Sequence, residues 1–499
     1  MNRIKFLLVI LHVTSMLAQA QTFEVHESPS TKIEKEYLSL GKSGSNEWSI
    51  HNQGINGWEL VSSDFKGKEI GNIVMDRNLP SESLSLDNAW LVGKEITLVG
   101  YYWNEENKSE TFYVGNYDMN GKQIGDWIPL ATIAVTRNEI AEAKYLLSED
   151  KRGFVISALS PDIKGGIMTY QLMSYSFADK KNHAYEFNLK TKERDLVAYH
   201  FTAKRPTKVI VTEHGEDHPD KSEKIANKQD PELHQIMVID MEKGKQESFE
   251  FSIPDKLIID AIGIETPNGI AVAGFYSDEL KRKKADCDGN FSLILSSGEW
   301  GTANVEAWDL AFKIEALGKK AAEKGKALNG AHRVRYIKNI SGGNFAVFGE
   351  QYGDFENDQG NKVHYSSGIL CVAYDGLGKT VWSHYIKNIV EKVYDDENIG
   401  FNVFVTPKYV HVVFMDDRGN WGKNGREDEV SSRTKFWNSY FTSATFDEQG
   451  TLVFHRIYDA DDIHLMMDPK NCTESADGSV AFYGKIKMKN GYGRVYFID

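Results

Sequence analysis

The stretch that decides the fold runs from Gly343 to Trp382 and contains two β-rich segments. The first reads GNFAVFGE at residues 343–350, and the second reads GILCVAYDGLGK at 368–379, followed by Val381 and Trp382. Aromatic and β-branched residues bounded by glycine or Asp/Gly turns are typical of short strands. This stretch therefore predicts antiparallel strands joined by turns.

The same pattern recurs along the chain. EITLVGYY at residues 95–102 precedes FYVGNYDMNGK at 112–122, and YVHVVF at 409–414 precedes ATFDEQG at 444–450. The first segment of each pair recurs near residues 48, 98, 155, 210, 272, 346, 412 and 481. A mean spacing of about 62 residues accommodates four short strands and their loops, which is the content of one propeller blade.

Each repeat also has a leading and a trailing strand. Leading strands are predicted at 144–147, 197–201, 334–337 and 401–405, and trailing strands at 382–386 and 452–457. We therefore predict an all-β fold, a β-propeller of seven or eight four-stranded blades. A pair of β-sandwich domains is the structural alternative.

The two ends of the chain predict how the ring closes. The last repeat ends on a third strand, Arg494–Ile498, and no residues remain for a fourth. The strand-like segment Thr22–Val25 follows a predicted leader and precedes a Ser/Pro turn. We expect it to complete the last blade, so that residues 21–499 form a single propeller domain.

Two stretches depart from the repeat. Residues 214–229 are polar and predict a surface loop between strands. Residues 308–328 are rich in Ala, Leu, Lys and Glu, which predicts a short helical insertion despite their glycines.

Residues 1–20 have the layout of a secretory signal peptide. Arg3 and Lys5 precede an apolar run from Phe6 to Leu17, and Ala18-Gln19-Ala20 fits a cleavage site. The run is too short to span a bilayer comfortably, and no later window approaches 18 apolar residues. We expect a soluble mature protein without membrane insertion, in the periplasm or outside the cell.

Charge and cysteine content exclude several classes. The 499 residues carry 58 basic and 72 acidic side chains, a net charge of -14, which disfavours nucleic-acid binding. Three distant cysteines, Cys287, Cys371 and Cys472, exclude a disulfide scaffold and a cysteine-rich zinc module. We expect them to be unpaired, although a disulfide between two of them stays open.

The central repeat resembles a known family. The residues that carry the resemblance are Arg335–Asn339, Gly342–Tyr352, Ile369–Lys379 and Val381-Trp382, which follow the Lys/Ala-rich insertion. They are similar to a family of uncharacterised exported propeller-like proteins of Bacteroidetes bacteria, firmly over about residues 300–420 and loosely elsewhere. The resemblance implies export and a propeller-like fold, and it supplies no catalytic residues.

Two motifs suggest nucleotide or metal chemistry. Ala373-x4-Gly378-Lys379-Thr380 fits a relaxed P-loop, but a working P-loop needs a helix after it, and here a strand is predicted. The segment Glu213–Asp220 contains two histidines and four carboxylates, with His234 further on. Gly215 and Pro219 argue against a helix, so a solvated acidic loop is favoured over a transition-metal site.

Two loops cluster oxygen ligands around glycine. They are Asp286–Asn290 and Asp354–Asn361, and Asp354, Glu356 and Asp358 are the weak metal candidates. Neither loop has EF-hand spacing, so turn chemistry explains them equally well, and we predict no bound metal or cofactor. The basic run at 281–284 is interpreted as a solvated loop.

The function is predicted only by class. No nucleophile elbow and no His-Glu-x-x-His motif occurs, so no catalytic residue is assigned. Trp103, Trp300, Trp421 and Trp437 are candidates for stacking on a sugar or protein, and packing between blades is the alternative for each. We expect a monomeric exported binding or scaffolding module for an unknown protein or glycan.

The alternative is a carbohydrate-active hydrolase or lyase at the mouth of the central channel. Two or more inward carboxylates or histidines within hydrogen-bonding reach and with shifted pKa values favour the enzyme.

Overall fold

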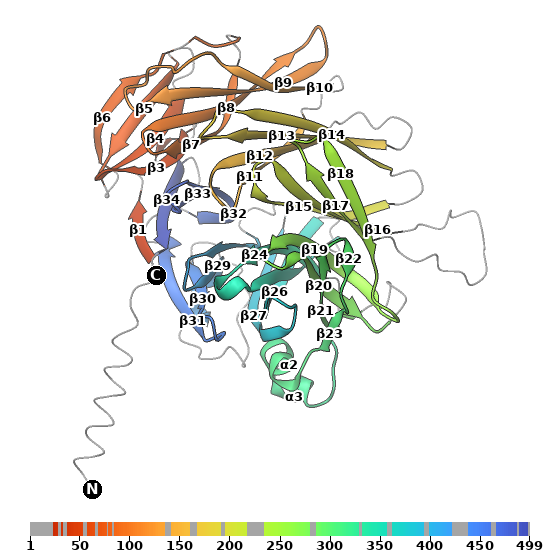
Figure 1. Ribbon diagram of the computed structural model, residues 1–499. Helices are drawn as coiled ribbons and strands as arrows, with labels where there is room; N and C mark the ends of the chain where they lie inside the picture. The colour runs from red at the N-terminus through yellow and green to blue at the C-terminus, as the bar shows by residue number, and fades with distance from the viewer. Residues whose placement is uncertain are drawn as a thin grey trace, which may run out of the picture.

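In the computed structural model, eight antiparallel sheets are arranged as a propeller ring (Figure 1). The sheets follow the chain in order, from the red and orange sheets to the blue ones. This confirms the predicted all-β propeller and sets the blade number at eight, in place of two stacked sandwiches. The structure describes residues 23–27, 31–32, 37–52, 57–64, 68–76, 78–81, 84–134, 141–159, 167–190, 195–216, 234–279, 286–328, 332–356, 362–393, 399–421, 438–460, 466–486 and 489–497.

The first four blades each contain four consecutive strands. The strands of a blade are given in chain order, which runs from the innermost strand outward. Blade 1 contains β3 (Tyr37–Ser43), β4 (Asn46–Asn52), β5 (Trp58–Ser63) and β6 (Glu69–Val74). Blade 2 contains β7 (Ser85–Val92), β8 (Glu95–Asn104), β9 (Ser109–Asp118) and β10 (Ile128–Ala134). Blade 3 contains β11 (Glu142–Leu147), β12 (Gly153–Leu159), β13 (Ile167–Ser176) and β14 (Asn182–Lys190). Blade 4 contains β15 (Asp195–Arg205), β16 (Lys208–Glu216), β17 (His234–Asp240) and β18 (Lys245–Phe251).

The other four blades include two variations. Blade 5 contains β19 (Leu257–Thr266), β20 (Gly269–Ser277) and β21 (Gly289–Ser296), and its fourth strand is divided into β22 (Glu299–Trp300) and β23 (Asn304–Ala307). Blade 6 contains β24 (His332–Asn339), β25 (Phe345–Glu356), β26 (Lys362–Tyr374) and β27 (Thr380–Val393). Blade 7 contains β28 (Phe401–Val405), β29 (Val410–Asp417), β30 (Ser439–Phe446) and β31 (Leu452–Asp459). Blade 8 contains β32 (Met466–Glu474), β33 (Val480–Ile486) and β34 (Lys489–Phe497), with β1 (Phe23–Glu27) as its fourth strand and β2 (Thr31–Lys32) also on β34.

The recurring sequence segment is the second strand of every blade. The eight predicted centres fall inside β4, β8, β12, β16, β20, β25, β29 and β33. In several blades this strand is buried along nearly its whole length, and all eight residues of β29 are buried. A strand covered on both faces has a near-continuous apolar sequence, which is why this segment was the clearest repeat signal.

The Asp/Gly turns have a common hydrogen-bond pattern. In the turn between β26 and β27, the Asp375 carboxylate accepts from the backbone N–H groups of Leu377 and Lys379, both at 2.9 Å. Asp118 and Asp447 do the same in blades 2 and 7. A short acceptor side chain that satisfies its own turn explains why Asp begins these turns.

The ring closes between blades 8 and 1. Strand β1 is antiparallel to β34, with Phe23 opposite Phe497 and Val25 opposite Val495; in Figure 1 the red strand lies beside the blue one. Arg494 of β34 is completely buried and reaches both blades: its guanidinium donates to Ser475 and Ser479 at 2.8 and 2.6 Å, and also to Ser39 of blade 1.

The core lies between neighbouring blades. Between blades 7 and 8, Phe441 meets Phe482 edge-on at 4.7 Å between ring centroids, and between blades 2 and 3, Trp90 stacks on Phe154 at 4.5 Å. Apolar clusters of this kind join successive blades around the ring. Each sheet therefore depends on its neighbours to bury its faces.

The predicted helical insertion is confirmed. It forms α2 (Leu310–Leu317) and α3 (Lys319–Ala322) beside β27, and Asp309 caps the first helix by accepting from the Phe312 N–H at 2.8 Å. Phe312 stacks on Trp308 at 4.0 Å and joins the core between blades 5 and 6. The insertion therefore packs against the ring through its aromatic residues.

The three cysteine thiols are unpaired in the structure. Burial raises the pKa of the Cys472 thiol to about 12 and raises the pKa values of Cys287 and Cys371 even more, so none is a thiolate at neutral pH. Within the part of the chain that the structure describes, no helix is long and apolar enough to cross a membrane.

Candidate functional site

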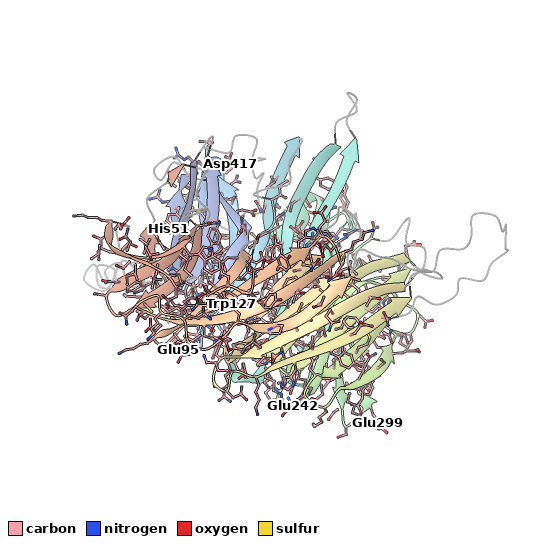
Figure 2. The ribbon with its side chains drawn as sticks, turned by 90° about the horizontal axis from the view of Figure 1, so that it is seen from above. His51, Glu95, Trp127, Glu242, Glu299 and Asp417 are labelled. Carbon is pink, nitrogen blue, oxygen red and sulfur yellow. The ribbon has the colours of Figure 1, made fainter. Side chains whose placement is uncertain are left out.

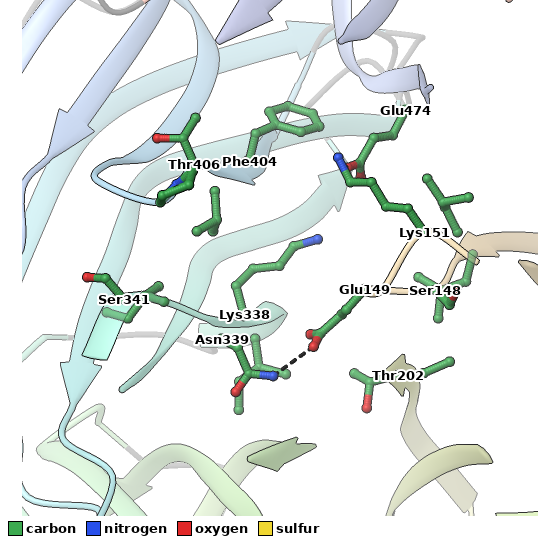
Figure 3. A pocket seen from close by; sticks show the side chains of 17 residues that line it. Ser148, Glu149, Lys151, Thr202, Lys338, Asn339, Ser341, Phe404, Thr406 and Glu474 are labelled. Atoms are coloured by element: carbon green, nitrogen blue, oxygen red, sulfur yellow. Dashed lines mark hydrogen bonds and ion pairs between the residues drawn. The ribbon is translucent and has the colours of Figure 1, made fainter. Parts of the chain in front are cut away.

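A cavity of about 420 Å³ lies where the innermost strands of several blades end (Figure 3). Its lining comes from the turn that follows β11 in blade 3, from the end of β15 in blade 4, and from the ends of β24, β28 and β32 in blades 6, 7 and 8. Inner strands surround the axis of a propeller, so their ends form one mouth of the central channel.

The turn after β11 contacts blades on the opposite side of the mouth. The amide nitrogen of Asn339, in blade 6, donates to the Glu149 carboxylate at 2.7 Å, as Figure 3 shows. The Lys151 ammonium lies 3.3 Å from the Glu474 carboxylate of blade 8. Because three non-adjacent blades are tied together here, the walls of the cavity are held in place.

Lys338 occupies the middle of this cavity. It precedes Asn339 on β24 and is half-buried, and Figure 3 shows its ammonium directed into the space between Glu149 and Phe404. Within the described ranges, its ammonium has neither a hydrogen-bond nor an ion-pair partner. A cation in a partly desolvated site gains free energy when an anion enters.

Glu149 is the titratable group beside that cation. Burial of its carboxyl raises the pKa of Glu149, whereas the hydrogen bond from Asn339 and the charges of Lys338 and Lys204 act to lower it. The net pKa lies above the usual value for glutamate. The lining thus contains two cations, Lys151 and Lys338, and two carboxylates, Glu149 and Glu474, and Lys338 is the cation that no direct ion pair holds among the described residues.

A second acidic cluster lies between blades 2 and 3. The Tyr145 hydroxyl donates to Asp87 of the inner strand β7, and burial raises the pKa values of both groups. Glu110 has a raised pKa for the same reason, and its carboxylate accepts from the Ala141 N–H at 2.9 Å. Asp87 as a whole residue is exposed, although the surrounding protein desolvates its carboxyl group, whereas Glu110 is only 1% exposed.

Two of the three weak metal candidates lie on one strand, and the third lies outside the described residues. Asp354 and Glu356 lie on β25, paired with His364 and Lys362 of β26, and Asp358 lies outside the described residues. Asp288 accepts from the Asp278 N–H at 2.8 Å, whereas Asn290 accepts from Tyr374 of blade 6 at 3.0 Å. Among the described residues, no three His, Cys, Asp or Glu side chains form a metal-binding group.

The P-loop-like motif is a turn between strands, as the sequence indicated. Gly378 has a φ of 88° in the turn that joins β26 to β27, and a strand follows it. The acidic segment differs in part from the prediction of a loop beginning at residue 214, because β16 continues to Glu216 and places His214 opposite His234 of β17. Residues 217–233, like the basic run at 281–284, lie outside the described residues.

The predicted stacking aromatics separate into two groups. Trp103 packs against the core between blades 2 and 3, and Trp300 meets Phe251 of blade 4 at 5.7 Å, so these two serve packing between blades. Trp421 is 39% exposed and lies edge-on to Tyr440 at 5.6 Å. Trp437 lies outside the described residues.

Sequence reasoning missed the residues of the mouth, although a usable signal was present. Glu149 and Lys151 follow the predicted leading strand 144–147, Lys338 and Asn339 follow 334–337, and Thr406 follows 401–405. Residues directly after a leading strand share one end of the channel. The repeat position, rather than a local motif, identifies them.

Comparisons with known proteins give only structural likeness. No family model matches the sequence, and no curated protein matches it. Among solved structures, the chain is similar to the WD40 domain of SCAP from fission yeast, with a TM-score of 0.38, 9% identity and coverage of 96% of this chain and 99% of that one.

Two other solved structures show likeness at the same level. The polysaccharide lyase Uly1 has a TM-score of 0.40 and 9% identity, with coverage of 87% and 93%. The β-propeller domain of the Trilobed protease from Pyrococcus furiosus has a TM-score of 0.33 and 13% identity, with coverage of 87% and 98%. Identities this low say nothing about a shared function.

Proposed function

We propose that this protein is an exported binding protein that holds an anionic ligand at the channel mouth. The observation that carries the proposal is the ammonium of Lys338, which is directed into a cavity of about 420 Å³ and has no direct hydrogen-bond or ion-pair partner among the described residues, although the Glu149 carboxylate belongs to the same lining. Asn339, Ser341 and Thr406 add amide and hydroxyl groups to the same lining. A ligand that carries a carboxylate and hydroxyl groups matches this set.

Isothermal titration calorimetry with galacturonate, and with galactose as its uncharged counterpart, tests the proposal. Galacturonate should bind and galactose should bind at least about tenfold more weakly, the equivalent of about 1.4 kcal/mol. Lys338→Gln should remove this preference. Glu149→Gln keeps an acceptor for Asn339 but removes a negative charge, so it should strengthen galacturonate binding.

Lys319→Gln is the matched control, because Lys319 lies on α3 outside the cavity. It should leave binding unchanged. All variants should melt at the temperature of the parent, which separates loss of binding from loss of folding. Equal binding of galacturonate by the parent and by Lys338→Gln would exclude the mouth as the anion site.

Export and a monomeric state are part of the proposal. The A-x-A site at Ala18–Ala20 supports cleavage before Gln21, and the family resemblance supports a periplasmic or extracellular destination. Mass spectrometry of the secreted chain should find Gln21 as its first residue, and an intact apolar run would contradict export. Light scattering should give the mass of one chain.

A carbohydrate-active hydrolase or lyase is the second candidate function, and Asp87 is the observation in its favour. Its carboxylate lies on an inner strand and accepts from the Tyr145 hydroxyl, and desolvation raises its pKa. However, the neighbouring carboxylate of Glu110 is buried and occupied by a backbone N–H. The binding role is therefore favoured. If the parent protein cleaved a polysaccharide and Asp87→Asn lost this activity, the enzyme would be favoured instead.

A further inference from the structure

A second depression lies beside the channel mouth. It is a groove of about 560 Å³ between blades 4 and 5, and the turns at the same end of the strands line it. Figure 2 labels Glu242, which follows β17 of blade 4, and Glu299 of β22 in blade 5. Four cations line the groove: Arg205, Lys208, Lys243 and Lys245.

Three of these four cations are already neutralised. Lys208 lies 3.0 Å from Glu265, Lys243 lies 3.0 Å from Asp240, and Lys245 lies 2.7 Å from Glu247, each measured from ammonium nitrogen to carboxylate oxygen. Arg205 is exposed, and its guanidinium has no hydrogen-bond or ion-pair partner within the described parts of the chain. The groove thus has one uncompensated positive charge.

The cavity and the groove adjoin two common structural elements. The first is the end of β15, where Thr202 and Ala203 line the cavity and Arg205 lines the groove. The second is Glu265, whose backbone carbonyl accepts from the Asn339 amide at 2.9 Å while its side chain pairs with Lys208.

Lys204 lies between the two depressions along β15. It has no ion-pair partner among the described residues, and its charge acts on Glu149 in the cavity. Lys338, Lys204 and Arg205 therefore provide, from the mouth to the groove, three cations that have no direct ion-pair partner among the described residues. The charges of Lys338 and Lys204 act on Glu149, and the charge of Arg205 acts on Asp240.

We infer that the cavity and the groove together bind one linear acidic glycan, with carboxylates at Lys338 and at Arg205. This inference rests on the proposed function and extends it from a single sugar to a chain. A small anion would use Lys338 alone and leave Arg205 without a role. Hydroxyl groups from Ser341, Thr406 and Ser297 along the two linings suit a hydroxyl-rich polymer.

The overall charge restricts which polyanion can bind. A net charge of -14 repels a long nucleic acid before contact, because electrostatic steering depends on the field of the whole molecule. A short glycan depends on contact with the three local cations instead. Binding should therefore weaken as salt increases, since the contacts are partly exposed.

The experiment compares galacturonate with its linear hexamer, using titration calorimetry on the full chain. The hexamer should bind about tenfold or more tightly than the monomer, because it adds a second charged contact. Arg205→Gln should weaken hexamer binding about tenfold and leave monomer binding unchanged. Lys338→Gln should weaken the binding of both probes.

Four results would overturn the inference. The first three leave the anion site at the mouth intact, and the fourth contradicts the proposed function as well. If Arg205→Gln leaves hexamer binding unchanged while Lys338→Gln weakens both probes, the mouth site stands and the extended site is wrong. If monomer and hexamer bind equally, one subsite is present. If hexaglutamate binds as tightly as the hexamer, the ligand is an acidic peptide. If neither variant affects either probe, the proposed function fails as well.

Discussion

Replacing Arg494 by Met tests how the ring is held closed. The side chain is fully buried in blade 8, and it links β34 to the turn after β32 and to Ser39 of blade 1. Its Nε lies 3.9 Å from the Glu47 carboxylate of β4, which is only 4% exposed. The variant therefore removes three hydrogen bonds and the contact between the Arg494 guanidinium and the Glu47 carboxylate, which also accepts from the Tyr496 hydroxyl at 3.2 Å.

The expected magnitude follows from that loss. Removing one partner of a buried ion pair costs about 3–5 kcal/mol, because the remaining charge is uncompensated. A typical free energy of unfolding is about 5–15 kcal/mol, so this one seam carries a large part of it. Urea unfolding followed by tryptophan fluorescence should show the loss as a lower midpoint, with light scattering to detect association through the opened blade.

A double variant makes the reasoning falsifiable. Arg494→Met with Glu47→Gln removes both charges and should regain part of the lost stability, because no buried carboxylate then remains at the position that faced the Arg494 guanidinium. Arg333→Met is the control, since Arg333 is exposed and surface changes stay within about 0.5 kcal/mol. A loss below about 1 kcal/mol for Arg494→Met, with no recovery in the double variant, would mean that the seam does not depend on this ion pair.

Four further predictions concern pH, packing, closure and metal. Burial lowers the pKa of His384, but its contacts with Glu315 (3.0 Å) and with the Gly450 carbonyl (2.8 Å) raise it more, so its folded pKa exceeds the usual 6.5. The charged form of His384 therefore stabilises the fold fully below the unfolded pKa of 6.5, and this stabilisation is lost as pH rises through the folded pKa. The melting temperature of the parent should fall over this pH interval, and that of His384→Gln should not. Gly274→Ala should lower the unfolding free energy by about 1–3 kcal/mol or more, because its Cβ would lie 2.0 Å from the Asp260 carbonyl oxygen. Gly93→Ala is the control and should cost only about 1 kcal/mol, because no atom lies within 4 Å of its Cβ. Equal losses of unfolding free energy in the two variants would contradict this reasoning. Deleting residues 21–27 should expose the edge of β34 and cause aggregation in light scattering, unlike deletion of the polar segment 217–229, and a stable monomer would show that β1 is dispensable. EDTA should leave the melting temperature unchanged, and a fall of several degrees would restore the calcium hypothesis for Asp354–Asn361.

The strands could be predicted because their burial is visible in the sequence. Second strands covered on both faces, such as Val410–Asp417, have apolar runs between turn residues. Asp375 and Asp447 mark turns for a local reason, since each satisfies its own backbone. The division of the blade 5 outer strand into β22 and β23 was not predictable, because outer strands are short and half-exposed and so have a weak pattern.

The candidate site could not be predicted from motifs because its residues are isolated in the sequence. Glu149 and Asn339 are 190 residues apart, and neither has neighbours that resemble a known site. The sequence attracted attention instead to Asp354 and Glu356, whose spacing on β25 reflects a paired strand. Clusters of like residues were easier to notice in the sequence than Lys338, an isolated lysine whose ammonium is directed into the cavity.

The position of the mouth in the repeat explains how an acidic chain can carry a cationic site. Every blade contributes the same short turn after its inner strand, and the ring places these turns around one axis. One or two lysines at this repeat position, such as Lys151 and Lys338, are therefore brought together although they are far apart along the chain. Composition averages over the whole surface and misses such a concentration. For a propeller of this kind, charge counted by position within the blade describes the lining of the mouth more directly than net charge does.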